Sequence, residues 1–81
     1  MKIDYTRKAL DDIERLPALV RKAFFKQIGF LAVDPRHPSL RTKKFQGLEN
    51  VWQCRVNDDW RFYFQIAGDV YTVFKVIPHP K

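Results

Sequence analysis

The sequence has one cysteine, Cys54, and only three glycines in 81 residues. An internal disulfide is therefore excluded, and Gly29, Gly47 and Gly68 stand too far apart to form a phosphate-cradling loop. The sequence also lacks a long apolar run and a charged leader followed by an apolar stretch. These absences predict a cytoplasmic protein with no membrane contact.

Residues for metal-ion or nucleophilic chemistry are also scarce. His37 and His79 each stand beside prolines and show, with Cys54, none of the usual zinc-ligand spacings. Ser39 follows His37 by two residues, but no orienting or oxyanion group can be assigned to such a pair. We therefore expect no metal site and no cofactor.

The charge balance is strongly basic. Fifteen Lys and Arg residues against nine Asp and Glu residues give a net charge of +6 and a pI near 9.8. Such a field attracts polyanions, and it fits a nucleic acid or an acidic protein partner equally well. The length allows a single domain over residues 1–81, with twelve aromatic residues to enlarge its core.

The first 33 residues predict a strand followed by two helices. Lys2–Tyr5 alternates as a short edge strand, and Thr6 is suited to cap the helix that follows. Pro17 ends that helix, whose apolar residues are Ala9, Leu10, Ile13 and Leu16. A second stripe runs through Ala18–Val33, on Val20, Phe24, Ile28 and Leu31. The tight connection predicts an antiparallel helical hairpin on one sheet face.

The connector over residues 34–50 is not helical, because it contains two prolines three residues apart. We expect its first part, residues 34–39, to be a loop. Arg41, Lys43 and Lys44 then form a local basic cluster. This cluster is compatible with a solvated connector and with a loop that tracks phosphates.

Residues 51–77 predict three strands joined by hairpin turns at 57–59 and 67–69. Alternation puts Trp60, Phe62, Phe64 and Ile66 on a core face and Arg61, Tyr63 and Gln65 opposite. In the last strand, strict alternation groups Lys75 with Tyr71 and Val73 and against Phe74 and Val76. The predicted fold is an α+β domain with a small, mostly antiparallel four-stranded sheet packed on an N-terminal helical hairpin.

The polar face of this sheet is the candidate site. Pairing through the two hairpins would bring Gln53 and Arg55 beside Arg61 and Tyr63, with Lys75 close on the next strand. Like charges on one face favour a bound anion, and guanidinium forks fit a phosphate bidentately. An ordinary solvated outer face is the alternative.

His79 lies just past the last predicted strand. It is the one side chain near this face whose unperturbed pKa lies near neutrality, so it is a candidate general acid or base. A solvated terminal histidine is the other interpretation. The residues alone leave both open.

Three stretches carry a family resemblance. They are the connector DPRHPSLRTKKFQGLENVWQCRV, the strand DDWRFYFQI and the strand VYTVFKVIPH. The leucine and basic residues after the HP pair, the tryptophan-led strand ending in Arg55, and the arginine at the second position of WRFYFQI are the telling features. In this order, and over essentially the whole chain, they resemble the RelE/ParE superfamily of bacterial and archaeal type II toxins.

The resemblance implies a RelE-like fold and a toxin neutralised by an acidic antitoxin. RelE-like members enter the ribosomal A site and cut messenger RNA by attack of the ribose 2′-OH on the adjacent phosphate. By position, Arg61 matches the family's strand arginine, Arg55 a basic position of the preceding strand, and His79 or Lys81 the basic position after the last strand. The implied catalytic set is Arg61, Arg55 and His79, and the implied substrate-binding set is Lys43, Lys44, Gln53, Tyr63, Lys75 and Lys81.

The sequence also departs from the family pattern. Gln53 stands where one kind of member has a lysine, the chain stops before the usual C-terminal helix and tyrosine, and no glutamate base lies on the sheet face. His79 is then the candidate to remove the 2′-OH proton.

The resemblance therefore predicts a ribosome-dependent mRNA endoribonuclease whose partners are an acidic antitoxin, the ribosome and mRNA, with operator DNA bound only through the antitoxin. ParE-like members instead poison DNA gyrase by a protein contact, so a gyrase inhibitor or a non-catalytic binding protein of the same fold is the alternative. A nucleic-acid-binding module without toxicity is a third.

Overall fold

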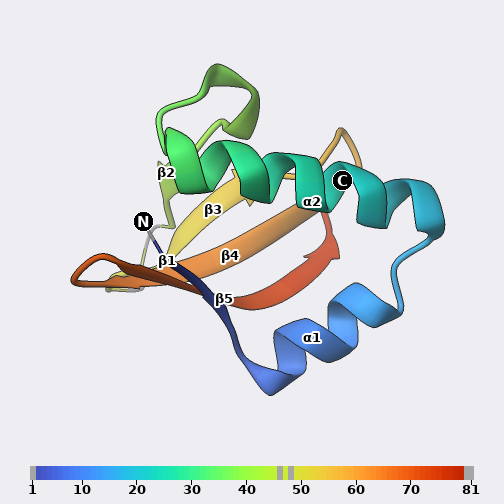
Figure 1. Ribbon diagram of the computed structural model, residues 1–81, viewed down its shortest axis with the longest axis horizontal. Coiled ribbons are helices and arrows are strands. Elements are labelled where there is room, and N and C mark those ends of the chain that lie inside the picture. The colour runs from blue at the N-terminus through green and yellow to red at the C-terminus, as the bar shows by residue number, and fades with distance from the viewer. Residues whose placement is uncertain (1, 46, 48, 80–81) are drawn as a thin grey trace.

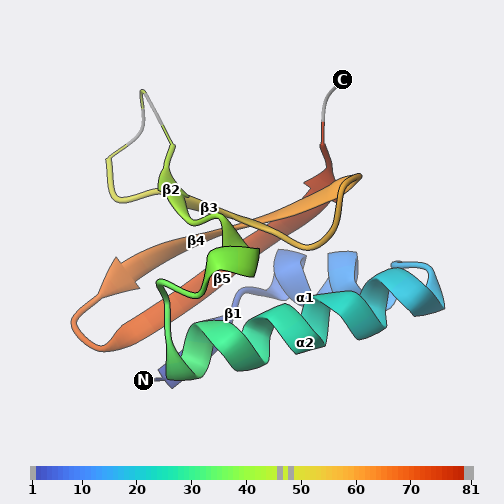
Figure 2. The same ribbon diagram turned by 90° about the horizontal axis from the view of Figure 1, so that it is seen from above.

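The computed structural model describes residues 2–45, 47 and 49–79. Over these residues the chain forms, in order, β1 (Lys2–Tyr5), α1 (Arg7–Glu14), α2 (Ala18–Val33), a short 3₁₀ helix η1 (Pro38–Leu40), β2 (Lys43–Lys44), β3 (Trp52–Arg55), β4 (Trp60–Ala67) and β5 (Val70–Pro78) (Figure 1). The two α-helices lie on the same side of the sheet, which leaves the other side uncovered by helices (Figure 2). Neither helix in the described part of the chain is long and apolar enough to cross a membrane.

The sheet has the strand order β1-β5-β4-β3-β2. β1 pairs with β5 in parallel, and the other neighbours are antiparallel. The α+β class, the mostly antiparallel sheet and the edge position of β1 are confirmed, but the expected four strands are five. The additional strand, β2, is two residues long, too short to show a period of its own. The amide of Phe45 donates to the Val51 carbonyl at 2.7 Å and closes the turn that brings β2 onto β3.

α1 begins at the predicted cap. The hydroxyl of Thr6 accepts the amide of Ala9 at 3.1 Å, as an N-cap side chain does. α1 ends at Glu14, three residues before Pro17, and Arg21 of α2 donates from its guanidinium to the carbonyls of Ile13 and Glu14. These bonds satisfy carbonyls that a helix end leaves unpaired and hold the two helices at their junction.

The helical stripes bury most of the residues expected of them. Ala9, Ile13 and Leu16 of the first predicted stripe are buried, but Leu10 is 50% exposed, because it falls at the edge of the face that α1 turns to β5. The second stripe is confirmed in Phe24, Ile28 and Leu31, with Val20 partly buried against the core. Phe24 is fully buried and meets Phe62 of β4 edge to face, with ring centroids 5.4 Å apart.

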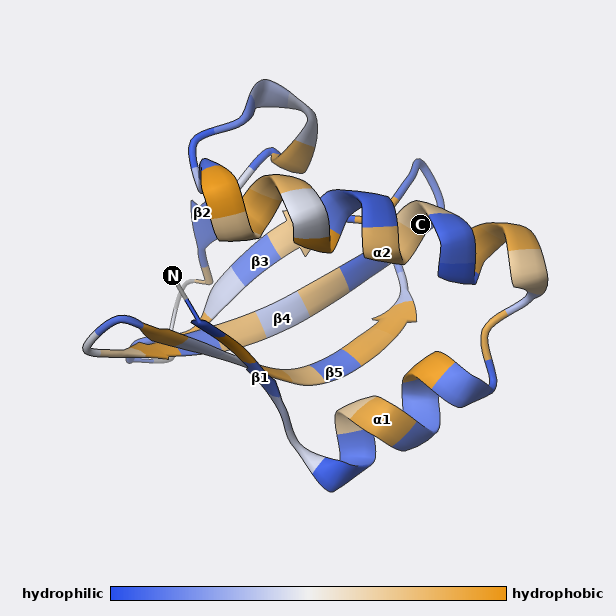
Figure 3. Cartoon of the chain, viewed as in Figure 1, coloured by the Kyte–Doolittle hydropathy of each residue, from blue (hydrophilic) through white to orange (hydrophobic). Residues whose placement is uncertain are grey.

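A β-bulge in β5 changes which residues face the core. Phe62 pairs with Val76 and Tyr63 with Lys75, but Phe64 pairs with Val73, so Phe74 is an extra residue opposite β4. As a result, Val73 and Val76 are both buried in the core. The expectation that Lys75 shares a face with Val73 is therefore wrong, because a bulge shifts the alternation by one residue. Figure 3 shows the polar and apolar residues alternating along these strands.

Cys54 lies in the core on β3 and is fully buried. Burial raises the pKa of its thiol to about 11, although a hydrogen bond with the Thr42 hydroxyl, 3.1 Å from Sγ, acts in the lowering direction. The thiolate is the reactive form, so a raised pKa and burial both suppress reaction.

We predict that iodoacetamide leaves Cys54 unmodified in the folded protein at about pH 8, close to the pKa of a free thiol. In denaturant the same reagent should label Cys54 readily, and the mass of the intact protein reports both results. Equal labelling rates with and without denaturant would show that Cys54 is not enclosed.

Candidate functional site

Two rows of side chains cross the sheet on the face away from the helices. The first row runs through the paired residues Lys43, Gln53, Tyr63 and Lys75 of β2, β3, β4 and β5. The second runs through Arg55, Arg61 and Ile77. The structure thus brings Gln53, Arg55, Arg61, Tyr63 and Lys75 together on one face, as the sequence predicted.

Arg61 is the most crowded cation of this face. Its Nη1 donates to the backbone carbonyls of Asn57 at 2.5 Å and Trp60 at 2.9 Å, which holds the guanidinium against the turn between β3 and β4. Partial burial lowers the pKa of Arg61, and the nearby charges of Arg55 and Arg41 lower it further. These cationic neighbours favour an anion at this position.

Arg55 is directly opposite Arg61 and is partly neutralised. Its Nη2 forms an ion pair with Oδ1 of Asp58, in the turn between β3 and β4. The Asp58 side chain is 86% exposed, so solvent screens this pair and an incoming phosphate could compete for the guanidinium.

Arg41 is a cation of the site that the predicted set of residues omitted. It ends η1 in the left-handed conformation, with φ 47°, and its amide donates to the Pro38 carbonyl at 3.2 Å. Its charge lowers the pKa of Arg61, which lies on a strand 20 positions later in the chain. The sequence marked Arg41 as basic, but a left-handed turn at a non-glycine residue leaves no pattern from which its direction could be read.

Tyr63 is covered rather than exposed. Its exposure is 5%, and the edge of Phe45 packs against the ring at a centroid distance of 5.5 Å. Phe74 lies on it at 6.4 Å, and the Lys75 ammonium sits 4.7 Å from the ring centroid. Burial raises the pKa of Tyr63, while Arg61 acts in the lowering direction. A base can therefore stack on Tyr63 only after these neighbours move.

Gln53, Lys43 and Lys44 lie next to this covered ring. Gln53 is 7% exposed and pairs with both Lys43 and Tyr63. Lys44 pairs with Trp52, so alternation turns it toward the other sheet face, although both lysines line a cavity of about 280 Å³ with Phe45 and Gln53. The predicted connector cluster is thus an edge strand carrying two exposed cations.

His79 continues the second row of the face. Its amide donates to the carbonyl of Asp59 at 2.7 Å, and alternation after Ile77, the partner of Arg61, places His79 on the same side. Its Nδ1 is buried and has no hydrogen-bond partner within the described residues. This unpartnered nitrogen and the position of His79 in the row of Arg61 make it the candidate for proton transfer in the site. Lys81, the other residue predicted here, lies outside the described residues.

A buried amide on α2 supports the site from beneath. Gln27 is 6% exposed, and its Nε2 donates to the carbonyls of Ser39 at 3.0 Å and Arg55 at 2.9 Å. The Ser39 hydroxyl donates to Oε1 of Gln27 at 3.2 Å and lies 2.9 Å from His37 Nδ1. Gln27 therefore joins α2 to η1, which leads into Arg41, and to the β3 carbonyl of Arg55. Sequence reasoning missed it because a glutamine inside a helix has no distinguishing pattern.

Gln27→Leu is expected to destabilise the fold by about 1 to 3 kcal/mol, because the carbonyls of Ser39 and Arg55 lose a buried donor. Urea unfolding followed by circular dichroism measures the change. Gln65→Leu, at an exposed position of β4, is the matched control and should alter stability by less than about 0.5 kcal/mol. Equal effects at the two positions would show that Gln27 does not join these elements.

The described residues contain no group of three or more His, Cys, Asp or Glu side chains that could hold a metal ion. What the face does offer is the guanidinium groups of Arg55 and Arg61, with the charge of Arg41 acting on Arg61 and a histidine nitrogen at the rim. This arrangement can bind a phosphate and stabilise added negative charge on it.

The structure defines the class of protein as a small α+β domain with a basic sheet face that no helix of the described residues covers. Comparison with known proteins supplies the family. A family model described as the ParE toxin of the type II toxin–antitoxin system parDE matches residues 3–80. The chain therefore belongs to the ParE toxin family, within the RelE/ParE superfamily of type II toxins. No curated protein matches it.

Several solved structures share the fold. A YoeB/ParE toxin from Agrobacterium tumefaciens superposes with a TM-score of 0.83 at 21% identity, over 99% of this chain and 100% of the other. A chain of the intact Escherichia coli RelBE toxin–antitoxin complex gives 0.78 at 19% identity, over 99% and 98%. The archaeal RelE–RelB complex from Pyrococcus horikoshii OT3 gives 0.78 at 16%, over 95% and 92%. At these identities the likeness establishes the fold alone.

Proposed function

We propose that this toxin cuts messenger RNA on the ribosome and thereby stops translation in the cytoplasm. The observation that carries the proposal is the pair of Arg55 and Arg61 on the helix-free sheet face, with His79 in the same row and the charge of Arg41 near enough to act on Arg61. A site that binds an exposed phosphodiester needs positive charge. The carboxylates of the protein itself must leave most of that charge unneutralised. On this face Asp58 forms an ion pair with Arg55, and the Asp58 side chain is 86% exposed.

The proposed reaction uses the side chains of this face to stabilise the transition state and to move a proton. The ribose 2′-oxygen attacks the adjacent phosphorus, the bond from phosphorus to the 5′-oxygen breaks, and the products carry a 2′,3′-cyclic phosphate and a 5′-hydroxyl. Arg61 and Arg55 stabilise the charge that builds on the phosphorane, with Arg41 as a third cation. His79 takes the 2′-OH proton, and water supplies the proton that the departing 5′-oxygen takes up. Lys43, Lys44, Gln53, Lys75 and Lys81 are proposed to hold the flanking RNA.

Inhibition of DNA gyrase is the second candidate. The specific observation in its favour is the family match, which is to the ParE toxin of parDE. Tyr63, the one tyrosine on the helix-free face, is covered by Phe45 and Phe74, so a nuclease site would rest on the arginines and His79 alone.

A cell-free translation extract separates the two candidates. Added protein should cut a ribosome-bound message and leave the same RNA intact without ribosomes, while supercoiling by gyrase continues. If the message stays intact and supercoiling stops, the nuclease proposal is wrong and the gyrase candidate is supported.

The proposed partner in the cell is an acidic antitoxin, and operator DNA would be bound only through it. Some solved structures of this fold are toxin–antitoxin complexes, among them RelE with RelB from two organisms. The net charge of +6 supports an acidic partner because opposite charge speeds association and fixes orientation. Binding should weaken as salt rises from low to physiological concentration.

A further inference from the structure

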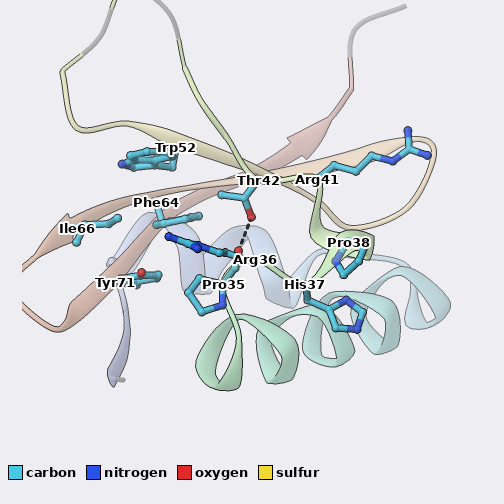
Figure 4. Close-up of a pocket in the computed structure, with 10 residues that line it drawn as sticks. All are labelled: Pro35, Arg36, His37, Pro38, Arg41, Thr42, Trp52, Phe64, Ile66 and Tyr71. Carbon is cyan, nitrogen blue, oxygen red and sulfur yellow. Dashed lines mark hydrogen bonds between the residues drawn. The ribbon is translucent and has the colours of Figure 1, made fainter.

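A pocket opens on the helix side of the sheet, opposite the arginine face. Its volume is about 460 Å³, which is within the usual range of ligand sites. The connector between α2 and β2 forms one wall through Pro35 and Arg36, and the sheet forms the other through Trp52, Ile66 and Tyr71 (Figure 4). The walls are therefore mainly apolar and come from segments far apart in the sequence.

Arg36 and Arg41 both line this pocket, and Arg36 is the one whose guanidinium lies within it (Figure 4). In Figure 4 its guanidinium reaches between the connector and the sheet toward Phe64, whereas Arg41 extends in the opposite direction. The backbone amide of Arg36 donates to Oδ1 of Asp34 at 3.0 Å. Within residues 2–45, 47 and 49–79, the guanidinium itself takes part in no ion pair and no hydrogen bond, and no carboxylate lines the pocket. An acidic group from outside would complete it.

Two kinds of polar group line the pocket, and together they decide what kind of ligand fits: the guanidinium groups of Arg36 and Arg41, which only donate hydrogen bonds, and the Thr42 and His37 side chains, which are already bonded within the chain. The Thr42 hydroxyl donates to the Pro35 carbonyl at 3.1 Å, and Nδ1 of His37 is bound by Ser39. The rings of Phe64 and Tyr71 stack on each other at 5.1 Å. The edge of a nucleobase also carries N–H donors, and these would find no free acceptor on Thr42 or His37. An apolar side chain has no such edge.

We propose that this pocket binds an acidic peptide segment of a partner protein, which inserts one apolar side chain between Trp52, Ile66 and Tyr71 and places a neighbouring carboxylate on Arg36. The inference deepens the partner part of the proposed function, since it assigns the acidic antitoxin an anchor point away from the arginine face. The charge complementarity of Arg36 favours this occupant over a second copy of a chain whose own charge is +6.

Random peptides displayed on phage test the proposal with the full-length protein. Selection on the wild-type protein should enrich peptides in which an apolar residue stands next to Asp or Glu. Arg36→Glu should weaken their binding by roughly tenfold or more, the loss expected when a charge pair becomes a repulsion. Lys22→Glu makes the same change of charge at an exposed position near the start of α2 and should have little effect. Bound peptide should also shift the NMR signal of the Trp52 indole N–H.

Several results would overturn the proposal. The first is that selection enriches no such peptides. The second is that the enriched peptides bind the Arg36→Glu protein as well as they bind wild type. The third is that an oligoribonucleotide shifts the Trp52 signal and the peptides do not. The outcome is separable from that of the proposed function. If peptides bind as stated while ribosome-bound message stays intact, the pocket proposal is supported and the nuclease proposal is wrong. If message is cut but no peptide binds as stated, the nuclease proposal is supported and the pocket proposal is wrong.

Discussion

Arg61→Ala is expected to lower the rate of message cleavage by about 100-fold to 1000-fold, the usual loss when one preorganised donor to the transition state is removed. Arg61 has this role because its guanidinium is fixed by the carbonyls of Asn57 and Trp60 and stands among other cations, so a phosphorane would meet a charge already in place. Single-turnover cleavage of ribosome-bound message measures the change.

Two controls separate chemistry from folding in this experiment. Arg61→Lys keeps a charge but loses the planar fork, so it should recover only part of the rate. Arg7→Ala removes a side chain on α1 that is 92% exposed and should cleave as the wild type does. An Arg61→Ala protein with native circular dichroism and an unchanged rate would remove Arg61 from the site.

Phe24→Ala is expected to destabilise the fold by about 3 to 5 kcal/mol. Phe24 is fully buried in the core, with 0% of its surface exposed to solvent. Its ring contacts Tyr5 of β1 and Phe62 of β4. Its removal would leave a cavity between α2 and the sheet. A domain of 81 residues is stable by about 4 to 12 kcal/mol, so the loss is a large part of the total.

The adjacent residue supplies the control for this prediction. Phe25 is 48% exposed and touches Phe24 edge to face, so Phe25→Ala should cost less than about 1.5 kcal/mol. Urea titration of both variants measures the difference between the two positions. Similar losses at Phe24 and Phe25 would mean that α2 does not pack on the sheet through Phe24.

The elements that local chemistry specifies could be predicted from the sequence. The hydroxyl of Thr6 caps α1, the apolar stripe of Ala18–Val33 gives α2 its observed bounds, and the turn residues between β4 and β5 form a hairpin in which Gly68 has φ 61°. Long-range pairing could not be predicted in the same way. β2 depends on contacts with β3, and the extra residue in β5 changes the alternation without a sequence signal.

Only part of the candidate site could be predicted, because some of its residues are brought together by long-range contacts. Arg55 and Arg61 follow from strand alternation and hairpin pairing, both of which are local. Arg41 joins them only through the left-handed end of η1, and Gln27 fixes that segment against β3 by hydrogen bonds that span up to 28 residues. The burial of Tyr63 depends on Phe45, which follows β2 and packs over the ring. Strand alternation therefore indicated the face on which Tyr63 lies but not that its ring is buried.

The chemistry of the cut ends tests the central claim most directly. Ribosome-bound message treated with the wild-type protein should carry a 2′,3′-cyclic phosphate on the upstream fragment and a 5′-hydroxyl on the downstream fragment, which a kinase can label without prior phosphatase. The Arg61→Ala protein should leave the same message largely intact. Intact message with the wild-type protein, or equal cutting by both proteins, would contradict a nuclease site on the arginine face.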